Sequence, residues 1–269
     1  MASTAGGPRA LQRFSRRMAG QALPPAVALG LALLLWEAFV AVTRMPPYLL
    51  PPPSAILGRL GQDPLALLGH ARVTLVEALV GLALGSAVGL SLGVLMAHSR
   101  FVERLVYPMA VAVRSTPFIA IAPLFILWFG FTLMPKAIVA ALATFFPMLV
   151  NAITGLRSVD PTTLEFFQSL RASRWEVFLH LRVPNALPYF FASLRLCVGL
   201  SLIGAVVGEL VGAREGLGYV IENAAINLLT STVFSAVILL TLMGVILTEL
   251  VAVLESRVLF WHESQRGKT

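Results

Sequence analysis

Uninterrupted apolar runs restrict this sequence more than any other feature. The longest runs are near or above the roughly 20 residues that a helix needs to cross about 30 Å of hydrocarbon. Because backbone groups in lipid must find partners within the protein, such runs favour helices over a barrel. Of the 269 residues, 58% are hydrophobic and only 12% are charged, about half the charged share of a soluble domain. The sequence therefore predicts an all-α integral membrane protein.

The distribution of basic residues predicts how these runs are oriented. Cytoplasmic loops carry an excess of Lys and Arg, and thirteen of these residues fall in the segments assigned to the inner side, against five in the outer segments. This bias predicts six transmembrane helices with the N- and C-termini both cytoplasmic. Cytoplasmic tails at 1–25 and 257–269 then flank one transmembrane domain at 26–256. The expected spans are 26–43, 71–97, 109–129, 136–156, 188–212 and 233–255.

The stretch 160–188 is the longest central segment that cannot lie in lipid. It holds seven acidic, basic or histidine side chains between two long apolar runs. Apolar residues recur at helical spacing on both sides of residues 171–173, which predicts two short amphipathic helices joined by a bend. Pro184 and Pro188 are expected to end the second helix, because proline lacks an N–H and disfavours helix just before it.

This stretch resembles the cytoplasmic coupling loop, or EAA loop, of the membrane subunits of binding-protein-dependent ABC importers. Glu165 matches the acidic position of that motif, residues 172–175 match the segment after its glycine, and Pro184 and Pro188 match its prolines. The resemblance implies a type I ABC importer permease-like fold, with cytoplasmic coupling helices between helices 4 and 5.

Two departures from the motif place bulk where the family keeps the turn tight. Phe166-Phe167 replace a pair of small residues, and Arg171 replaces the glycine. Outside the loop, three further segments are similar to sulfonate-, taurine- and nitrate-type permeases. These segments are LLPPPS at 49–54, RSTPFIAIAP at 114–123 and AREGLGYVI at 213–221.

The resemblance also implies partners. Two ATP-binding subunits are expected to dock on the loop, a second permease copy to complete a homodimer, and an extracytoplasmic solute-binding protein to deliver solute. The lipid bilayer surrounds the spans, and no nucleic acid is expected. The residues expected to couple to the ATPase are Glu165, Phe166, Phe167, Ser169, Leu170, Arg171, Ala172, Ser173, Arg174 and Trp175.

No cofactor site is expected on this chain. The terminal Gly267-Lys268-Thr269 resembles the end of a P-loop, but His262 stands where the first glycine belongs and no helix follows,. ATP is therefore expected on a partner subunit. No cluster of His, Cys and Asp has the spacing of a metal site, so none is predicted.

Charged side chains within the spans are the remaining candidates, because each costs at least about 2.5–3.5 kcal/mol near the bilayer centre. Glu209 is interpreted either as a pathway or gate residue near the outer side or as a structural partner for a neighbouring helix. Arg195 lies about 21 Å away along the same helix, so the two cannot pair, and it is expected to snorkel toward the inner surface. Glu37, Glu77 and Glu249 are expected to be structural.

Four aromatic residues of the third span offer a second candidate for the pathway. They could line a passage for a flat organic solute, although aromatic residues at this spacing more often pack between helices. They are Phe118, Phe125, Trp128 and Phe129.

Three functions are compared. The favoured one is a multi-pass permease subunit of the cell inner membrane, without enzyme activity, that imports a small organic or anionic solute. The resemblance suggests a thiamine-precursor pyrimidine, a riboflavin-like compound, a sulfonate such as taurine, or nitrate. The alternative is a stand-alone ion-coupled secondary carrier that uses Glu209 and Arg195. A membrane hydrolase has only a G-x-S-x-G pattern at 89–93 to support it, and that pattern lies within a predicted helix.

Overall fold

The structure is a computed structural model that describes residues 9–260, with the backbone alone described for 9–23 and 26. Every regular element in this range is helical, as predicted. Both chain ends, and with them parts of the two predicted tails and Gly267-Lys268, lie outside the described residues. The elements are α1 (Arg9–Thr43), α2 (Pro53–Gln62), α3 (Pro64–His98), α4 (Arg100–Ser115), α5 (Phe118–Phe129), α6 (Leu133–Arg157), α7 (Pro161–Ser169), α8 (Arg174–Val177), the π-helical turn η1 (Phe178–Arg182), α9 (Val183–Leu210), α10 (Leu217–Ile226) and α11 (Thr230–Val258).

Four helical stretches of the described chain are long and apolar enough to cross a membrane, namely α3, α6, the continuous stretch Arg174–Leu210, and α11. Helices α4 and α5 meet the same test as a pair that is bent by 96°. The apolar part of α1, Val27–Thr43, is shorter. These segments coincide with the six predicted spans, but length and composition support four or five, so the six-helix count stays a prediction.

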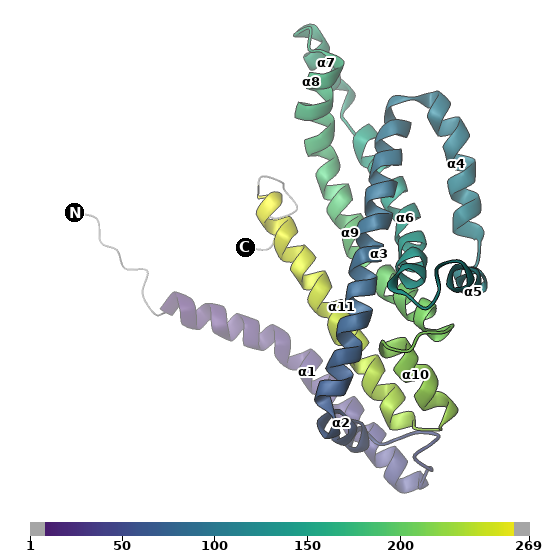
Figure 1. Cartoon of the computed structure of the whole chain (residues 1–269). Helices are drawn as coiled ribbons and strands as arrows, with labels where there is room; N and C mark the ends of the chain where they lie inside the picture. Colours follow the sequence, from purple (N-terminus) through teal and green to yellow (C-terminus); the bar gives the residue numbers. More distant parts are fainter. Residues whose placement is uncertain (1–8, 261–269) are drawn as a thin grey trace.

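The helices form an elongated bundle with two distinct ends (Figure 1). Helices α7 and α8 lie at one end, and α2 and α10 lie at the other. Helix α1 is tilted away from the bundle. It is joined to α2 through Glu37, whose carboxylate accepts hydrogen bonds from the Ser54 N–H (3.0 Å) and hydroxyl (2.7 Å). The structural role predicted for Glu37 is confirmed.

Helix α1 is longer than predicted. It begins at Arg9 and passes through Pro24 and Pro25, so the described part of the predicted tail 1–25 is helical. The residues before these prolines are mostly Ala, Leu, Gln, Arg and Met, which have high helix propensity. Residues 9–25, which were predicted to belong to the cytoplasmic tail, are therefore part of the helix.

Two other predicted boundaries are wrong for a shared reason. Helix α3 begins at Pro64 rather than 71, and α4 begins at Arg100, inside a segment predicted to be an inner loop. Polar residues cap both helices: an Asp63 carboxylate oxygen accepts from the Ala66 N–H (3.2 Å), and the Ser99 hydroxyl oxygen accepts from the Val102 N–H (3.3 Å). Such N-caps allow a helix to begin before its apolar part.

A break divides the third predicted span. It falls at residues 116–117, between α4 and α5, where Pro117 supplies the residue that cannot continue the helix. Pro123, by contrast, lies within α5 without ending it.

Pro184 and Pro188 do not end the second coupling helix, contrary to the prediction. The chain is helical without a gap from Arg174 to Leu210. The turn before Pro184 is the π-helical η1, closed by a bond from the Val183 N–H to the Phe178 carbonyl five residues back. A widened turn of this kind, common where helices bend, accommodates the proline so that the helix continues as α9.

Glycines at four-residue spacing along α3 allow it to pack closely on α6. A Cβ atom built at Gly85 would lie 2.4 Å from the Ala141 carbonyl oxygen, and one at Gly81 would lie 2.3 Å from the Ala140 Cβ. Small residues bring helix backbones together in this way in membranes. The buried Cys197 belongs to the adjoining core cluster between α3, α6 and α9, as expected for a small core residue.

Candidate functional site

The α7–α8 loop is held in one conformation by its own hydrogen bonds. An Asp160 carboxylate oxygen accepts from the Thr163 N–H (2.9 Å) and caps α7. At α8, Ser173 and Glu176 form a reciprocal capping box, with the Ser173 N–H donating to the Glu176 carboxylate (2.6 Å) and the Glu176 N–H donating to the Ser173 hydroxyl oxygen (3.2 Å). Each cap satisfies donors that a helix start otherwise leaves without partners.

Arg171 forms the bend between the two helices. Its φ of 55° places it in the left-handed region. The Arg171 N–H donates to the Gln168 carbonyl (2.9 Å) and the Ala172 N–H to the Phe167 carbonyl (3.1 Å), which together make a Schellman motif at the end of α7. Glycine is favoured at this position because it has no Cβ. The bend predicted at residues 171–173 is therefore confirmed.

The loop lies at one end of the bundle (Figure 1) and carries large apolar side chains that are exposed. Phe166, Leu170 and Trp175 are 59%, 63% and 65% exposed. Of the ten residues predicted to couple to an ATPase, Phe167 and Ala172 are half-buried and the other eight are exposed. We call the exposed side chains of residues 165–175 the coupling surface.

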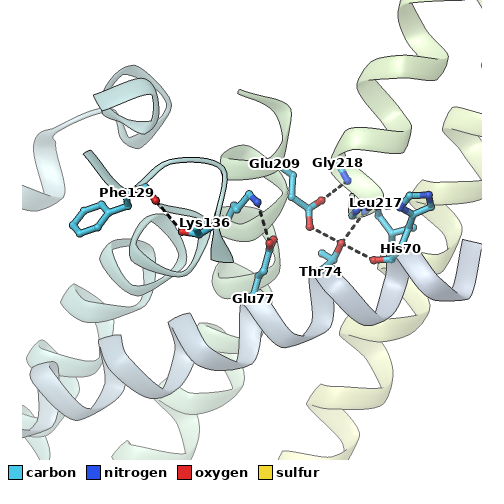
Figure 2. A network of polar contacts seen from close by, with 10 residues as sticks. His70, Thr74, Glu77, Phe129, Lys136, Glu209, Leu217 and Gly218 are labelled. Carbon is cyan, nitrogen blue, oxygen red and sulfur yellow. Dashed lines mark hydrogen bonds and ion pairs between the residues drawn. The ribbon is translucent and has the colours of Figure 1, made fainter. Parts of the chain in front are cut away.

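A second polar site lies toward the other end of the bundle, where three side chains cap α10 (Figure 2). The Gly216 N–H donates to His70 Nδ1 (3.1 Å), the Leu217 N–H to the Thr74 hydroxyl oxygen (2.8 Å), and the Gly218 N–H to Glu209 Oε2 (2.5 Å). The Thr74 hydroxyl in turn donates to Glu209 Oε1 (2.7 Å). The first amides of α10 thus bond to α3 and α9, and a carboxylate lies at the positive end of the α10 dipole.

Glycine is required where Glu209 meets the start of α10. A Cβ at Gly216 would lie 2.3 Å from the Glu209 carboxylate, and Gly216 also has φ of 109°. A Cβ at Gly218 would lie 2.7 Å from the Val206 carbonyl oxygen. Glu209 itself is fully buried. This geometry accounts for Glu209 as a structural partner of a neighbouring helix, and a gating role stays a prediction.

An ion pair between α3 and α6 adjoins this cap. Lys136 Nζ lies 3.4 Å from Glu77 Oε1, and the two residues are only 6% and 2% exposed (Figure 2). Lys136, the first residue of the predicted span 136–156, had been counted among the five basic residues of the outer segments, and its burial was missed. One signal was available: Glu77 continues the four-residue spacing of Gly81 and Gly85 along α3, so it shares the face that packs on α6.

Arg195 is paired, not snorkelling as predicted. Its guanidinium forms an ion pair with Glu255 near the end of α11. Because Glu255 is only 5% exposed, the charge of Arg195 is paired with a carboxylate inside the bundle. Glu209 and Arg195, the two residues on which the ion-coupled carrier depends, therefore lie in separate clusters.

The four aromatic candidates all lie on α5, next to the sharp bend. The Phe125 and Trp128 rings meet edge to face, with centroids 5.9 Å apart. Trp128 and Phe129 are 65% and 45% exposed, whereas Phe118 and Phe125 are half-buried. Their role in a passage stays a prediction.

These features define a class of protein. An all-helical bundle with several membrane-length helices, a broken helix pair and a capped loop exposed at one end is the architecture of a membrane-embedded transport subunit. A family model, "Binding-protein-dependent transport system inner membrane component", matches residues 85–260. The chain belongs to this family and is a multi-pass membrane permease, which confirms the resemblance found in its sequence.

Two relatives match almost the whole chain. The formylaminopyrimidine transport permease protein of Halalkalibacterium halodurans is 37% identical over 91% of this chain and 98% of its own length. The riboflavin transport system permease protein of Chloroflexus aurantiacus is 38% identical over 95% of each chain. Among solved structures, a chain of an inward-facing methionine ABC transporter has a TM-score of 0.59 at 19% identity, covering 71% of this chain and 98% of that chain. The last likeness concerns the fold alone.

Proposed function

We propose that this chain is the permease subunit of an ABC importer that is driven through the coupling surface. In this proposal six helices cross the membrane and both termini lie in the cytoplasm. Two copies of the chain enclose the passage, and two ATP-binding subunits dock on their coupling surfaces. A solute-binding protein delivers solute at the opposite end, where α2 and α10 lie.

The observation that carries this proposal is the combination of exposure and order in the α7–α8 loop. Exposed aromatic and aliphatic side chains, in a loop that the sequence predicts to lie outside the lipid, favour a protein partner. The capping box and the Schellman motif order the backbone that carries these side chains, so little backbone entropy is lost when a partner binds. An interfacial loop with no partner would not need such order.

The continuous helix from Arg174 to Leu210 supplies a path for force. It has 37 residues, which at 1.5 Å per residue span about 55 Å. One end carries the coupling surface, and the other ends beside Glu209 and the cap of α10. Movement of α7 and α8 would therefore reach the far end through one continuous helix and not through a series of loops.

The solute proposed is small and organic or anionic. Relatives named for formylaminopyrimidine and for riboflavin cover the chain almost completely, and a taurine transport system permease protein of Escherichia coli is 28% identical over 87% of it. A thiamine-precursor pyrimidine, a riboflavin-like compound and a sulfonate therefore form the candidate set.

Docking is tested by co-purification with the ATP-binding subunit. Trp175→Ala removes a large ring that is exposed in the free chain. An aromatic residue that becomes buried at the centre of an interface contributes about 2 kcal/mol or more to the binding free energy. We expect at least a tenfold loss of the bound ATP-binding subunit, and complete loss for Glu165→Lys combined with Trp175→Ala.

Leu57→Ala is the matched control, because Leu57 is 66% exposed on α2 at the opposite end (Figure 1). This variant is expected to retain the partner in full. If the doubly substituted coupling surface still retains the ATP-binding subunit at the wild-type ratio, the docking assignment is wrong.

A further inference from the structure

A cavity opens beside the buried Glu77–Lys136 pair. It has a volume of about 460 Å³ and lies between α3, the turn from α5 to α6, and the segment before α10. Its size is within the range of sites for small organic ligands. The lining residues that matter for its chemistry are Arg72, Glu77, Phe131, Lys136, Arg214 and Glu215.

The charges around this cavity are not balanced in pairs. Lys136 and Glu77 neutralise each other in its buried wall. Arg72 and Arg214 are exposed, and neither forms an ion pair anywhere in the part of the chain that is described. Glu215 lines the same cavity without lying within ion-pair distance of either arginine. Two guanidinium groups thus remain free to bind an anion.

The position of Arg214 is constrained by its neighbours in the protein. The Arg214 guanidinium stacks on the Phe131 ring, 5.5 Å from its centroid. Residues 214 and 215 also precede Gly216, whose N–H is bound by His70. A smaller cavity of about 380 Å³ adjoins on the side of His70 and shares Arg72 and Glu215 in its wall. Arginines held in place lose less entropy when they bind a ligand.

A charged cavity of this kind is not a surface for lipid tails. Each charge facing hydrocarbon near the bilayer centre costs at least about 2.5–3.5 kcal/mol. Irregular backbone, such as the turn at residues 130–132 and the segment 211–216, is tolerated at membrane depth only where it is buried in protein or lines a water-filled space. The cavity is therefore a polar recess in the protein.

We propose that this recess binds an oxyanion group, namely a sulfonate, carboxylate or phosphate, through Arg72 and Arg214. Guanidinium groups recognise such groups by paired hydrogen bonds as well as by charge. This inference rests on the proposed function, because the anion is taken to be part of a transported solute. It restricts the candidate solutes to acidic ones. The same chemistry would also hold a free inorganic anion.

The test measures anion-induced stabilisation of the purified full-length permease in complex with its ATP-binding subunit. Sodium methanesulfonate is titrated against sodium chloride at equal ionic strength, and the unfolding temperature is followed. We expect a saturable rise with methanesulfonate and none with chloride. Arg72→Ala and Arg214→Ala are each expected to weaken apparent binding about ten- to hundredfold, with Arg214→Lys intermediate because it keeps the charge and loses the planar fork.

Arg59→Ala is the control. Arg59 is hydrogen-bonded to Thr232, lines a different cavity, and is expected to leave methanesulfonate binding unchanged. A rise that chloride matches, or that survives both cavity variants, overturns the proposal. Binding of inorganic sulfate without binding of methanesulfonate overturns the assignment to an organic solute. The amount of bound ATP-binding subunit is measured on the same samples, so failure of the importer assignment is seen separately.

Discussion

Arg171 occupies a backbone position that favours glycine. In the left-handed region an L side chain costs roughly 1–2 kcal/mol, while glycine loses about 0.5–1 kcal/mol of conformational entropy on ordering. The hydrogen bonds of the Schellman motif hold Arg171 there. The resemblance to importer permeases had marked this position as a glycine, and the structure supplies the physical reason.

Arg171→Gly is therefore expected to stabilise the bend by about 1 kcal/mol. The amides of residues 171 and 172 should exchange with deuterium about fivefold more slowly than in the wild type. Arg174→Gly, placed within helix α8, serves as the control and should accelerate exchange, because glycine weakens a helix. Unchanged or faster exchange in Arg171→Gly would contradict the assignment of strain to this residue.

The Lys136–Glu77 pair gives a prediction about buried charge. Lys136→Met leaves Glu77 buried with no cation beside it, and breaking such a pair costs about 3–5 kcal/mol. The purified variant should unfold at a clearly lower temperature than the wild type. The double variant Lys136→Met with Glu77→Gln should recover most of that loss, because the unpaired charge is then removed. Equal destabilisation of the single and double variants would show that the ion pair is not the cause.

At the scale of the element, the glycine stripe of α3 makes a test of helix packing. Gly85→Ala would place a methyl group 2.1 Å from the Thr144 hydroxyl oxygen and 2.4 Å from the Ala141 carbonyl, so α3 and α6 must separate. We expect the unfolding temperature of the purified protein to fall, with a cost of about 1–3 kcal/mol.

Gly199 in α9 is the matched glycine, since a Cβ there meets nothing within 4 Å. Gly199→Ala is expected to be neutral or to stabilise by up to about 1 kcal/mol. If both alanine variants behave alike, close approach of α3 to α6 is not what these glycines provide.

Much of the arrangement of elements could be predicted from the sequence. Three features depend only on residues that are close together in the sequence, and such local features can be recognised without the tertiary structure. They are the membrane-length apolar runs, the glycine spacing of α3 and the bend around Arg171. Prolines act differently at two positions. A helix breaks at Pro117, whereas the π-helical turn η1 accommodates Pro184, which was predicted to end a helix. A widened turn depends on hydrogen bonds several residues away, and a rule about single prolines does not include it.

The polar cluster of His70, Thr74 and Glu209 was harder to predict from the sequence, because its residues come from distant segments. His70 and Thr74 meet Glu209 only after α3, α9 and α10 have packed. Lys136 was counted with the outer segments, and only its partner Glu77 on α3 explains its burial. The ion-pair partner of Arg195 is likewise distant in the sequence, since Glu255 lies 60 residues away.

At the scale of the whole molecule, the two ends of the bundle have different chemistry. One end carries α7 and α8, and the other carries α2 and α10 (Figure 1). The exposed side chains at the first end are partly apolar, and the arginine-lined recess lies beside the segment before α10. The continuous helix Arg174–Leu210 joins the two ends. In the proposed importer, force received at one end would change the environment of a solute toward the other.

Photocross-linking can detect whether the ATP-binding subunit contacts the coupling surface, through which force is proposed to enter. A photoreactive benzoylphenylalanine replaces Trp175 in cells that also produce the ATP-binding subunit, and the same group at position 57 serves as the control. The account predicts a covalent product with the ATP-binding subunit from position 175 and none from position 57. A product from position 57 alone, or none from either position while the complex still transports, would contradict it.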